Sequence, residues 1–291
     1  MSQKVNLNAY FERIGFAGSI APTLATLETI HALHPASIPF ENLDPLLGLP
    51  VSLDLGAIER KLLAEGRGGY CYEHNLLLQA VLRELDFPVK SFAAQVLWSD
   101  SDATDRPATH MLLAVEISGT TYIADVGFGG LTLTAPLKLR ADIEQPTPHE
   151  TFRLTGGDPL WRLEARIGEA WKPLYAFEAV EKSVGDYAEA NDRHSADPES
   201  PFRQHLLVAL APEGKRLALH DNRLTIREAD QPDETRLLTS LAEMHDVLTD
   251  TFDIHLPNAE LLDPRLEAIL AAAGVVADVT ADVAAEDPGQ A

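Results

Sequence analysis

The sequence predicts an α+β fold in which a helical N-terminal region is followed by a region rich in short strands. Up to about residue 86, apolar residues recur at the three- and four-residue spacing of amphipathic helices. From Pro88 on, the apolar stretches become short and turn residues separate them, which is typical of a sheet or a small barrel. A second group of short strands, at residues 204–229, precedes two further helical stretches.

Four helices are expected in the N-terminal region. An asparagine can cap a short first helix, and a second helix begins at Pro22 and ends before Pro35. The proline-rich segment 37–50 is expected to form an ordered loop. Asp54 can cap the third helix, and the fourth begins at the only cysteine of the chain, Cys71.

Cys71 follows Gly68 and Gly69 in the stretch RGGYCYEHN. The glycines suit a tight loop, and the apolar pattern after them predicts a helix that begins at the cysteine. Unpaired backbone N–H groups and the positive end of the helix dipole favour a thiolate there, which is the nucleophilic form of cysteine. The alternative interpretation is a buried cysteine that packs as a small apolar residue.

His110 and Asp125 lie near the ends of two predicted strands that are joined by a turn at Ser118–Gly119. If the strands form a hairpin, the two side chains lie close to opposite one another. A carboxylate in that position can fix the tautomer of an imidazole and stabilise its charged form. Such a histidine alone is more often a core residue, so the hypothesis depends on the pair occurring together with Cys71.

At these positions the chain resembles the arylamine N-acetyltransferases. The cysteine motif of that family is similar to RGGYCYEHN, and its histidine stretch is similar to THMLLAV at residues 109–115. Its aspartate motif is similar to DVGFG at residues 125–129, and an N-terminal FENL motif matches at residues 40–43. The four motifs occur in order, and a weaker resemblance continues to about residue 250.

The resemblance implies three domains built on a cysteine-protease-like or transglutaminase-like core. A helical bundle in residues 1–86 would carry the nucleophile, and a central antiparallel β-barrel in residues 87–190 would carry the histidine and the aspartate. An α/β lid with its preceding linker would occupy residues 191–275. The small, acidic segment 276–291 is expected to be a disordered tail.

The resemblance also implies a function for these residues. Cys71, His110 and Asp125 would form a catalytic triad that carries an acetyl group from acetyl-CoA to an arylamine or arylhydrazine, in a ping-pong cycle through a cysteine thioester. A buried ion pair between Arg67 and Glu41 would shape the cysteine loop. The residues implied for acceptor binding are Phe40, Val96, Phe128 and Phe202. Those implied for coenzyme A binding are Trp98, Thr109, Gly127, Gly129 and Gly130.

The glycines at residues 127–130 have two interpretations. Successive backbone N–H groups in such a loop could hold a phosphate of coenzyme A. A glycine-rich strand end is, however, usually only a turn. The chain has no Walker lysine and no GxGxxG motif, so a nucleotide hydrolase or a dinucleotide-binding fold is unsupported.

Composition limits the partners that can be expected. Against 23 Lys and Arg stand 45 Asp and Glu, which gives a net charge of −22. Such a chain is unsuited to nucleic acid, and any contact with the phosphates of coenzyme A must be local. One cysteine excludes an internal disulfide and a multi-cysteine zinc site, so no metal is expected. A free thiol, no signal-peptide core and no long apolar run predict a cytoplasmic protein without membrane contact.

The triad alone does not separate transfer from hydrolysis. Papain-like peptidases and transglutaminase-like proteins also use a cysteine followed by a histidine. The same residues could therefore hydrolyse an amide, or close an amide within a carrier-bound polyketide, as related family members do. A non-catalytic binding protein that keeps the fold is the remaining alternative.

Overall fold

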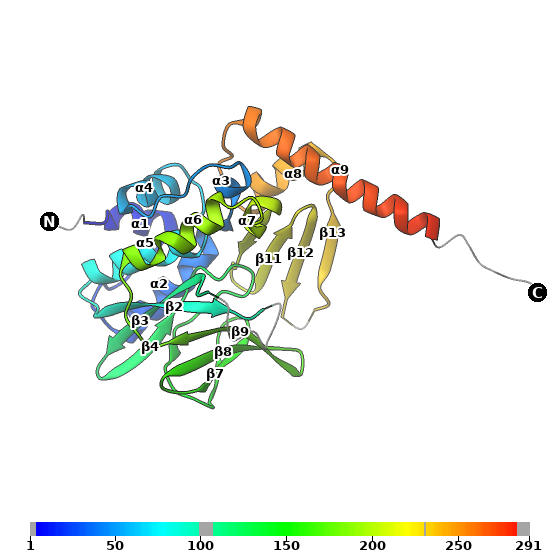
Figure 1. Ribbon diagram of the computed structural model, residues 1–291. Helices are drawn as coiled ribbons and strands as arrows, with labels where there is room; N and C mark the ends of the chain where they lie inside the picture. The colour runs from blue at the N-terminus through cyan, green and yellow to red at the C-terminus, as the bar shows by residue number, and fades with distance from the viewer. Residues whose placement is uncertain (1–3, 99–106, 230, 284–291) are drawn as a thin grey trace, which may run out of the picture.

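The computed structural model describes residues 4–98, 107–229 and 231–283, and the surroundings of their side chains up to residue 274. Figure 1 shows the N-terminal helices gathered above a large sheet, with a second sheet beside them and the last helix extending away from the body. Within these described residues, no helix is long and apolar enough to cross a membrane.

Residues 4–86 hold five α-helices, where four were predicted. They are α1 (Leu7–Ile14), α2 (Leu24–Ser37), α3 (Leu43–Leu46), α4 (Leu55–Glu59), which continues into the π-helical turn η1 (Arg60–Ala64), and α5 (Cys71–Glu84). Side-chain caps explain three of the starts, because the side chains of Asn6, Thr23 and Asp54 each accept a backbone N–H from the first turn. The predicted cap at Asp54 is confirmed.

Two expectations for this region are wrong. Helix α2 continues through Pro35 to Ser37, because buried packing of His31, His34 and the proline holds its last turn. Segment 37–50 is not only a loop, since it contains strand β1 (Phe40–Glu41) and helix α3. Both of these depend on contacts with the C-terminal region that the local sequence does not reveal.

The larger sheet is antiparallel and barrel-like, with the strand order β5-β4-β3-β2-β9-β8-β7-β6. Its strands are β2 (Val89–Val96), β3 (His110–Ile117), β4 (Thr120–Ala124), β5 (Leu137–Lys138), β6 (Glu144–Pro146), β7 (Thr151–Gly156), β8 (Leu160–Ile167) and β9 (Ala170–Glu178). In the β3–β4 hairpin, Leu113 pairs with Ala124 and Ile117 pairs with Thr120. The predicted turn at Ser118–Gly119 is therefore confirmed.

The second sheet joins the two ends of the chain. Its order is β1-β10-β11-β12-β13, with β10 (Leu207–Leu210), β11 (Lys215–His220), β12 (Arg223–Glu228) and β13 (Glu234–Leu237). Strand β1 pairs with β10, so that Phe40 lies opposite Ala209. This pairing was not predicted, because two residues of strand carry no periodic signal.

The remaining helices lie between and after the strands of the second region. They are η2 (Val184–Tyr187), α6 (Ala188–Ala196), α7 (Pro201–Gln204), α8 (Leu241–Asp246), η3 (Val247–Thr251) and α9 (Ala259–Val283). Helix α9 passes its expected end at Ala273, because the alanine-rich sequence sustains a helix. The first part of the expected disordered tail, residues 276–283, is thus helical, and residues 284–291 lie outside the described part.

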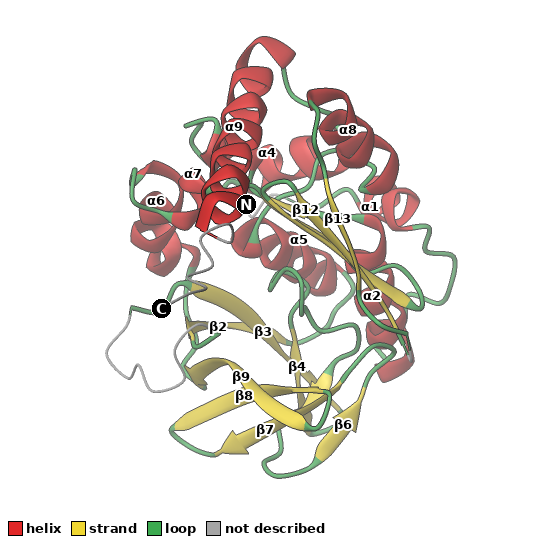
Figure 2. Ribbon diagram, turned by 90° about the vertical axis from the view of Figure 1, so that its right-hand side faces the viewer, coloured by secondary structure: helices red, strands yellow, loops and turns green. Residues whose placement is uncertain are grey.

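Helix α5 is the central element of the largest core. Figure 2 shows it between the other N-terminal helices and the larger sheet, and it packs against β3 and β2. Its residues Leu77, Leu78, Val81 and Leu82 are fully buried. The start of α5, and with it Cys71, therefore lies where the helical region meets the sheet.

Candidate active site

Cys71 is the first residue of α5, and its side chain is 5% exposed. The residue before it, Tyr70, is the N-cap, and the Tyr70 backbone N–H donates to Glu73 Oε2 at 3.0 Å. The first N–H groups of a helix have no partner inside the helix. Together with the helix dipole, they favour negative charge on the Cys71 sulfur.

His110 begins β3 and lies between Cys71 and Asp125. Its Nε2 lies 2.7 Å from Asp125 Oδ2. Burial disfavours the charged ring, but the charge and the hydrogen bond of Asp125, together with the neighbouring Cys71 side chain, outweigh it and raise the pKa of His110 to about 10. A positively charged imidazole at neutral pH is the counter-ion that a cysteine thiolate needs.

Both oxygens of the Asp125 carboxylate are held. While Oδ2 faces His110, Oδ1 accepts from Asn75 Nδ2 at 2.9 Å and from the Gly127 N–H at 3.0 Å. Burial raises the pKa of Asp125, but the charge of His110 and these hydrogen bonds lower it below its usual value. Sequence reasoning gave Asn75 no role, although it is the last residue of the RGGYCYEHN motif and lies one turn after Cys71 on α5.

His31 lies behind Asp125 on helix α2. Its Nε2 accepts the Asp125 backbone N–H at 3.1 Å, which places the ring proton on Nδ1. Burial lowers the pKa of His31 to about 4, so the ring is neutral at neutral pH. A single histidine on a helix gave no signal in the sequence, and its contact with Asp125 depends on the packing of α2 against the sheet.

Gly127 lets the loop after β4 approach the start of α5. A Cβ atom at this position would lie 2.8 Å from Cys71 Cα and 2.9 Å from Asn75 Nδ2, so only glycine fits. The Gly127 N–H, one of the backbone groups that could have faced a phosphate, donates to Asp125 instead. The close approach explains why a glycine follows the aspartate and valine of this motif.

Buried ion pairs hold the loop that precedes Cys71. Arg67 pairs with Glu41 at 2.8 Å and with Asp44 at 2.9 Å. Lys61 pairs with Asp44 at 2.7 Å and with Glu73 at 2.8 Å. The expected pair between Arg67 and Glu41 is therefore confirmed, and the structure extends it into a network that reaches the first turn of α5.

The carbonyl oxygen of Thr109 accepts hydrogen bonds from several side chains beside the triad. It accepts from Tyr72 Oη at 2.9 Å and from His194 Nε2 at 2.9 Å, and it lies 3.9 Å from Cys71 Sγ. A carbonyl oxygen has two lone pairs, which the two nearer donors occupy. No motif marked His194, which comes from α6 and reaches the site only in the folded chain.

The chain is similar to proteins of known family. The N-acetyltransferase family model matches residues 23–261. The arylamine N-acetyltransferase of Escherichia coli (strain K12) is 40% identical over 255 residues, which cover 87% of this chain and 90% of that protein. The chain belongs to the arylamine N-acetyltransferase family. The family member of Mycobacterium tuberculosis (strain ATCC 25618 / H37Rv) is 39% identical over 274 residues, 92% of this chain and 96% of that protein.

Solved structures of arylamine N-acetyltransferases have the same fold. The M. tuberculosis structure has a TM-score of 0.86 at 39% identity and covers 90% of this chain and 99% of that chain. The Mycobacterium marinum structure in complex with CoA has a TM-score of 0.87 at 36% identity and covers 91% of this chain and 99% of that chain. These similarities confirm the predicted α+β fold class.

Two of the residues that the family resemblance implied for acceptor binding form one aromatic wall. The rings of Phe40 and Phe202 lie 6.3 Å apart, although one follows α2 and the other lies on α7. His194 extends this wall, because its ring lies edge-on to Phe202 at 4.8 Å. All three side chains are half-buried.

The other two residues implied for acceptor binding, Phe128 and Val96, lie on the side of the larger sheet. The Phe128 ring is edge-on to His110 at 5.2 Å. Val96 pairs with Tyr175 across β2 and β9, and the Tyr175 ring lies 5.0 Å from that of His110. The structure thus gathers Phe128 directly at the triad and Val96 one strand away from it.

The residues implied for coenzyme A are spread over a wider area. Thr109 touches Cys71 through its carbonyl, as described above. Gly129 lies beside Phe40, since a Cβ on it would meet that ring at 3.6 Å. Gly130 is exposed, and Trp98 is 54% exposed just after β2.

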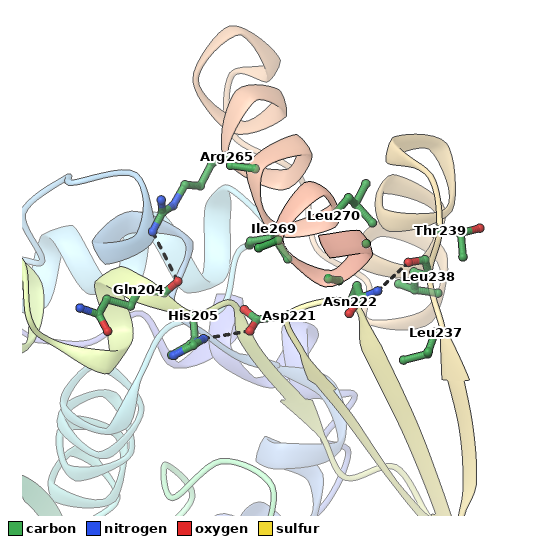
Figure 3. Close-up of a pocket in the computed structure, with 14 residues that line it drawn as sticks. Gln204, His205, Asp221, Asn222, Leu237, Leu238, Thr239, Arg265, Ile269 and Leu270 are labelled. Atoms are coloured by element: carbon green, nitrogen blue, oxygen red, sulfur yellow. Dashed lines mark hydrogen bonds and ion pairs between the residues drawn. The ribbon is translucent and has the colours of Figure 1, made fainter. Parts of the chain in front are cut away.

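A cavity of ≈ 760 Å³ lies apart from the triad, beside helix α9 (Figure 3). Its lining includes His205, Asp221, Leu237 and Arg265, and it contains no residue of the triad. The cavity therefore belongs to the second sheet and α9 and does not adjoin Cys71.

Proposed function

We propose that this chain transfers an acetyl group from acetyl-CoA to the nitrogen of an arylamine or arylhydrazine, in a ping-pong cycle through a thioester on Cys71. The observation that carries this proposal is the position of His110 between Cys71 and Asp125 at the start of a buried helix. The names of the relatives support the reaction, and the complex of the M. marinum relative with CoA supports the donor.

The first half-reaction loads the cysteine. Cys71 passes its proton to His110, and the thiolate attacks the carbonyl carbon of acetyl-CoA. The backbone N–H of Cys71 at the start of α5 is the proposed donor to the oxyanion that forms. When the intermediate collapses, coenzyme A leaves as a thiol with the proton from His110, and the acetyl group remains on the sulfur.

The second half-reaction transfers the acetyl group from Cys71 to the amine. The amine nitrogen attacks the Cys71 thioester, and the amine proton passes to His110, which Asp125 holds in one orientation. Collapse of the intermediate forms the amide and returns the Cys71 thiolate beside the protonated ring. A weakly basic arylamine is uncharged at neutral pH, so it needs no strong base to begin the attack.

We propose that the acceptor, a flat aromatic ring, binds between apolar side chains beside the sulfur. We assign the walls of this site to Phe40 and Phe202 on one side and to Phe128 and Val96 on the other. Support comes from the ring contacts between Phe40 and Phe202 and between Phe128 and His110. Aromatic rings prefer edge-on or offset contact with one another, which such walls provide.

Coenzyme A must be held locally, because the net charge of −22 repels its phosphates. We assign the backbone N–H groups of Gly129 and Gly130 to a phosphate, and Trp98 and Thr109 to the approach of the donor. Gly127 contributes to this loop through its close contact with Cys71 rather than through its own N–H, which Asp125 occupies.

Burial of the nucleophile favours transfer over hydrolysis. Cys71 is 5% exposed and His110 is 3% exposed, so little water reaches the thioester. A water-poor site lets a bound amine compete with solvent for the acetyl group. The free thiol also favours the reducing cytoplasm as the compartment of this chain.

The proposal is tested by intact-mass measurement after incubation with acetyl-CoA. We expect one acetyl adduct, located on Cys71, which disappears when an arylamine is added and yields the acetylated amine. Cys71→Ala serves as the control, and it is expected to fold normally but to form neither adduct nor product. An unmodified chain that gives no arylamide would overturn the proposal, and steady release of acetate without any amine would favour hydrolysis.

A further inference from the structure

Apart from the triad, three side chains that could bind an ion lie together at one end of the second sheet. His205 Nδ1 lies 2.8 Å from Asp221 Oδ2, and His220 Nδ1 lies 3.6 Å from the same oxygen. The two imidazole rings lie 5.2 Å apart. Figure 3 shows His205 and Asp221 pointing toward one another at the edge of the cavity beside α9. None of these residues takes part in the proposed acetyl transfer.

The backbone around the cluster is fixed by the sheet. His220 is the last residue of β11 and pairs with Leu207 of β10. Asp221 opens the turn to β12 with a φ of 52°, and its Oδ1 accepts the Leu206 N–H at 2.9 Å. This bond leaves the other carboxylate oxygen directed toward the two histidines.

The backbone of His205 is held as firmly. Its N–H donates to the Pro201 carbonyl at 2.9 Å, and its own carbonyl accepts from Asn42 Nδ2 at 2.7 Å. The Cα positions of all three residues are therefore set before any ligand binds, which reduces the ordering that a ligand would have to impose.

We propose that His205, His220 and Asp221 form a binding site for a divalent transition-metal ion of the Zn²⁺, Co²⁺, Ni²⁺ or Cu²⁺ class. Two imidazole nitrogens and one carboxylate oxygen are the donors that these ions prefer, whereas Mg²⁺ and Ca²⁺ prefer oxygen alone. The three ligand atoms all lie within 4.8 Å of one another. Among the residues that the structure describes, no other group of three histidine, cysteine or acidic residues meets this condition.

The separations also fit a tetrahedral ion. Bonds of about 2.0–2.1 Å place neighbouring ligand atoms about 3.3 Å apart. The two separations from Asp221 Oδ2, 2.8 Å and 3.6 Å, lie on either side of that value. Modest rotations of the two rings would thus complete the three-ligand geometry and leave the fourth position to water.

The setting of the cluster favours a cation that exchanges with solvent. The side chains of His205 and His220 are 46% and 62% exposed, so an ion reaches them without any opening of the fold. The net charge of −22 raises the local concentration of cations around the chain.

An ordinary surface pair between a histidine and an aspartate is the competing explanation, and the chain contains a matched example of one. His245 Nε2 lies 2.9 Å from Asp263 Oδ1, and both side chains are about one-third exposed. No third ligand joins this pair within the described residues. It therefore provides the control for a histidine–carboxylate contact that lacks the third ligand.

The test is calorimetric titration of the full chain, free of any purification tag, with Zn²⁺. Cys71 is first alkylated with iodoacetamide, because a free thiolate would itself bind the ion. We expect one equivalent of Zn²⁺ to bind. His220→Gln and Asp221→Asn should each weaken binding roughly ten- to hundredfold, since even loss of a residue behind a metal ligand has that effect. Asparagine keeps the acceptor for the Leu206 N–H and tolerates the positive φ.

The matched substitution His245→Gln should leave the affinity unchanged. Titration with Co²⁺ adds an optical readout, because visible absorption typical of a tetrahedral nitrogen–oxygen site should appear in the alkylated chain and be lost in His220→Gln. Absence of stoichiometric binding, equal affinity in all variants, or an equal loss in His245→Gln would overturn the proposal. None of these readouts depends on acetyl transfer, so the metal site and the proposed enzyme activity fail or succeed separately.

Discussion

Two buried histidine networks meet helix α5, and they differ in charge. In the triad, His110 lies 2.7 Å from the Asp125 carboxylate, and its pKa is raised to about 10. In the second network, Tyr10 Oη lies 2.8 Å from His34 Nδ1, and His34 Nε2 lies 2.9 Å from His74 Nδ1. Burial lowers the pKa of His74 to about 4 and lowers that of His34 as well.

The final acceptor of each network explains the difference. His74 Nε2 donates to the Pro39 carbonyl at 3.1 Å, so His74 Nδ1 must accept from His34, and His34 Nδ1 must accept from Tyr10. Every hydrogen bond in this series is satisfied with both rings neutral. At His110 the final acceptor is a carboxylate, which offsets the cost of burying a charged ring. Burial is therefore common to both networks, and the final hydrogen-bond acceptor decides whether the histidine is charged.

The largest expected effect on acetyl transfer comes from removing the Asp125 carboxylate. Asp125→Asn keeps the shape of the side chain but leaves His110 in a neutral network, like that of His34 and His74. We expect kcat/KM for acetyl transfer to fall by about 10⁴, as in serine triads with the same change. Asp263→Asn, which removes the carboxylate partner of a surface histidine, is the control and should keep normal activity. A near-normal rate in the Asp125 variant would refute its role.

A smaller loss of acetyl-transfer activity is expected when the three triad residues are kept but shifted in position. Gly127→Ala places a methyl group within 2.8 Å of Cys71 Cα, so the backbone must move. A displacement of about 1 Å near a reacting centre can cost roughly 10²-fold in rate. Steady-state kinetics measures the loss, with Gly185→Ala as control, because its Cβ would meet only Ser183 Oγ at 3.7 Å. Equal kcat values in the two variants would contradict the close-packing argument.

The neutral network should affect stability and not chemistry. Tyr10→Phe leaves His34 Nδ1 buried without a donor, and we expect unfolding to become easier by about 1–3 kcal/mol. Urea denaturation at neutral pH measures this change. The kcat/KM of the folded variant should stay unchanged. If it fell as far as in Asp125→Asn, the two networks would not be separable in function.

The smallest effect expected is on the pH dependence of stability. The pKa of His74 is lowered from 6.5 to about 4, so the unfolded state binds more protons between these values. The contribution of His74 to the free energy of unfolding is therefore full above pH 6.5 and is lost as the pH falls toward 4. The raised pKa of His110 acts in the opposite direction, because its contribution is full below pH 6.5 and is lost as the pH rises through about 10.

The substitution His74→Gln tests how much His74 contributes to the loss of stability at acid pH. Glutamine keeps a donor for Pro39 and an acceptor for His34 but does not titrate. We expect the fall in unfolding free energy toward acid pH to become shallower by at most about 1.4 kcal/mol per pH unit, the value for one proton. Urea denaturation across the acid range measures it, with His245→Gln as the surface control. An unchanged slope would show that His74 does not resist protonation in the folded chain.

Local motifs explain why the centre of the site could be predicted. The start of α5 at Cys71 and the turn at Ser118–Gly119 each depend on neighbouring residues, so the positions of the candidate nucleophile and of the pair of His110 and Asp125 could be predicted from sequence. The fold class was predictable for the same reason, because helical spacing gives way to short strands near residue 88.

The long-range contacts could not be predicted. His194 and His31 come from α6 and α2, and their contacts with the site appear only when distant elements pack together. Asn42 belongs to the FENL motif, but its contacts with the carbonyls of Phe202 and His205, each at 2.7 Å, depend on long-range packing that the motif does not reveal. The domain boundaries at residues 86, 190 and 275 stay predictions.

The most direct test of the charged triad is the rate of Cys71 alkylation by iodoacetamide as a function of pH, followed by intact mass. We expect the unsubstituted chain to react much faster at neutral pH than Asp125→Asn, because only the former holds His110 charged beside the sulfur. Asp125→Asn should require a higher pH to reach the same rate. The same curve for both chains would contradict a thiolate stabilised by His110 and Asp125.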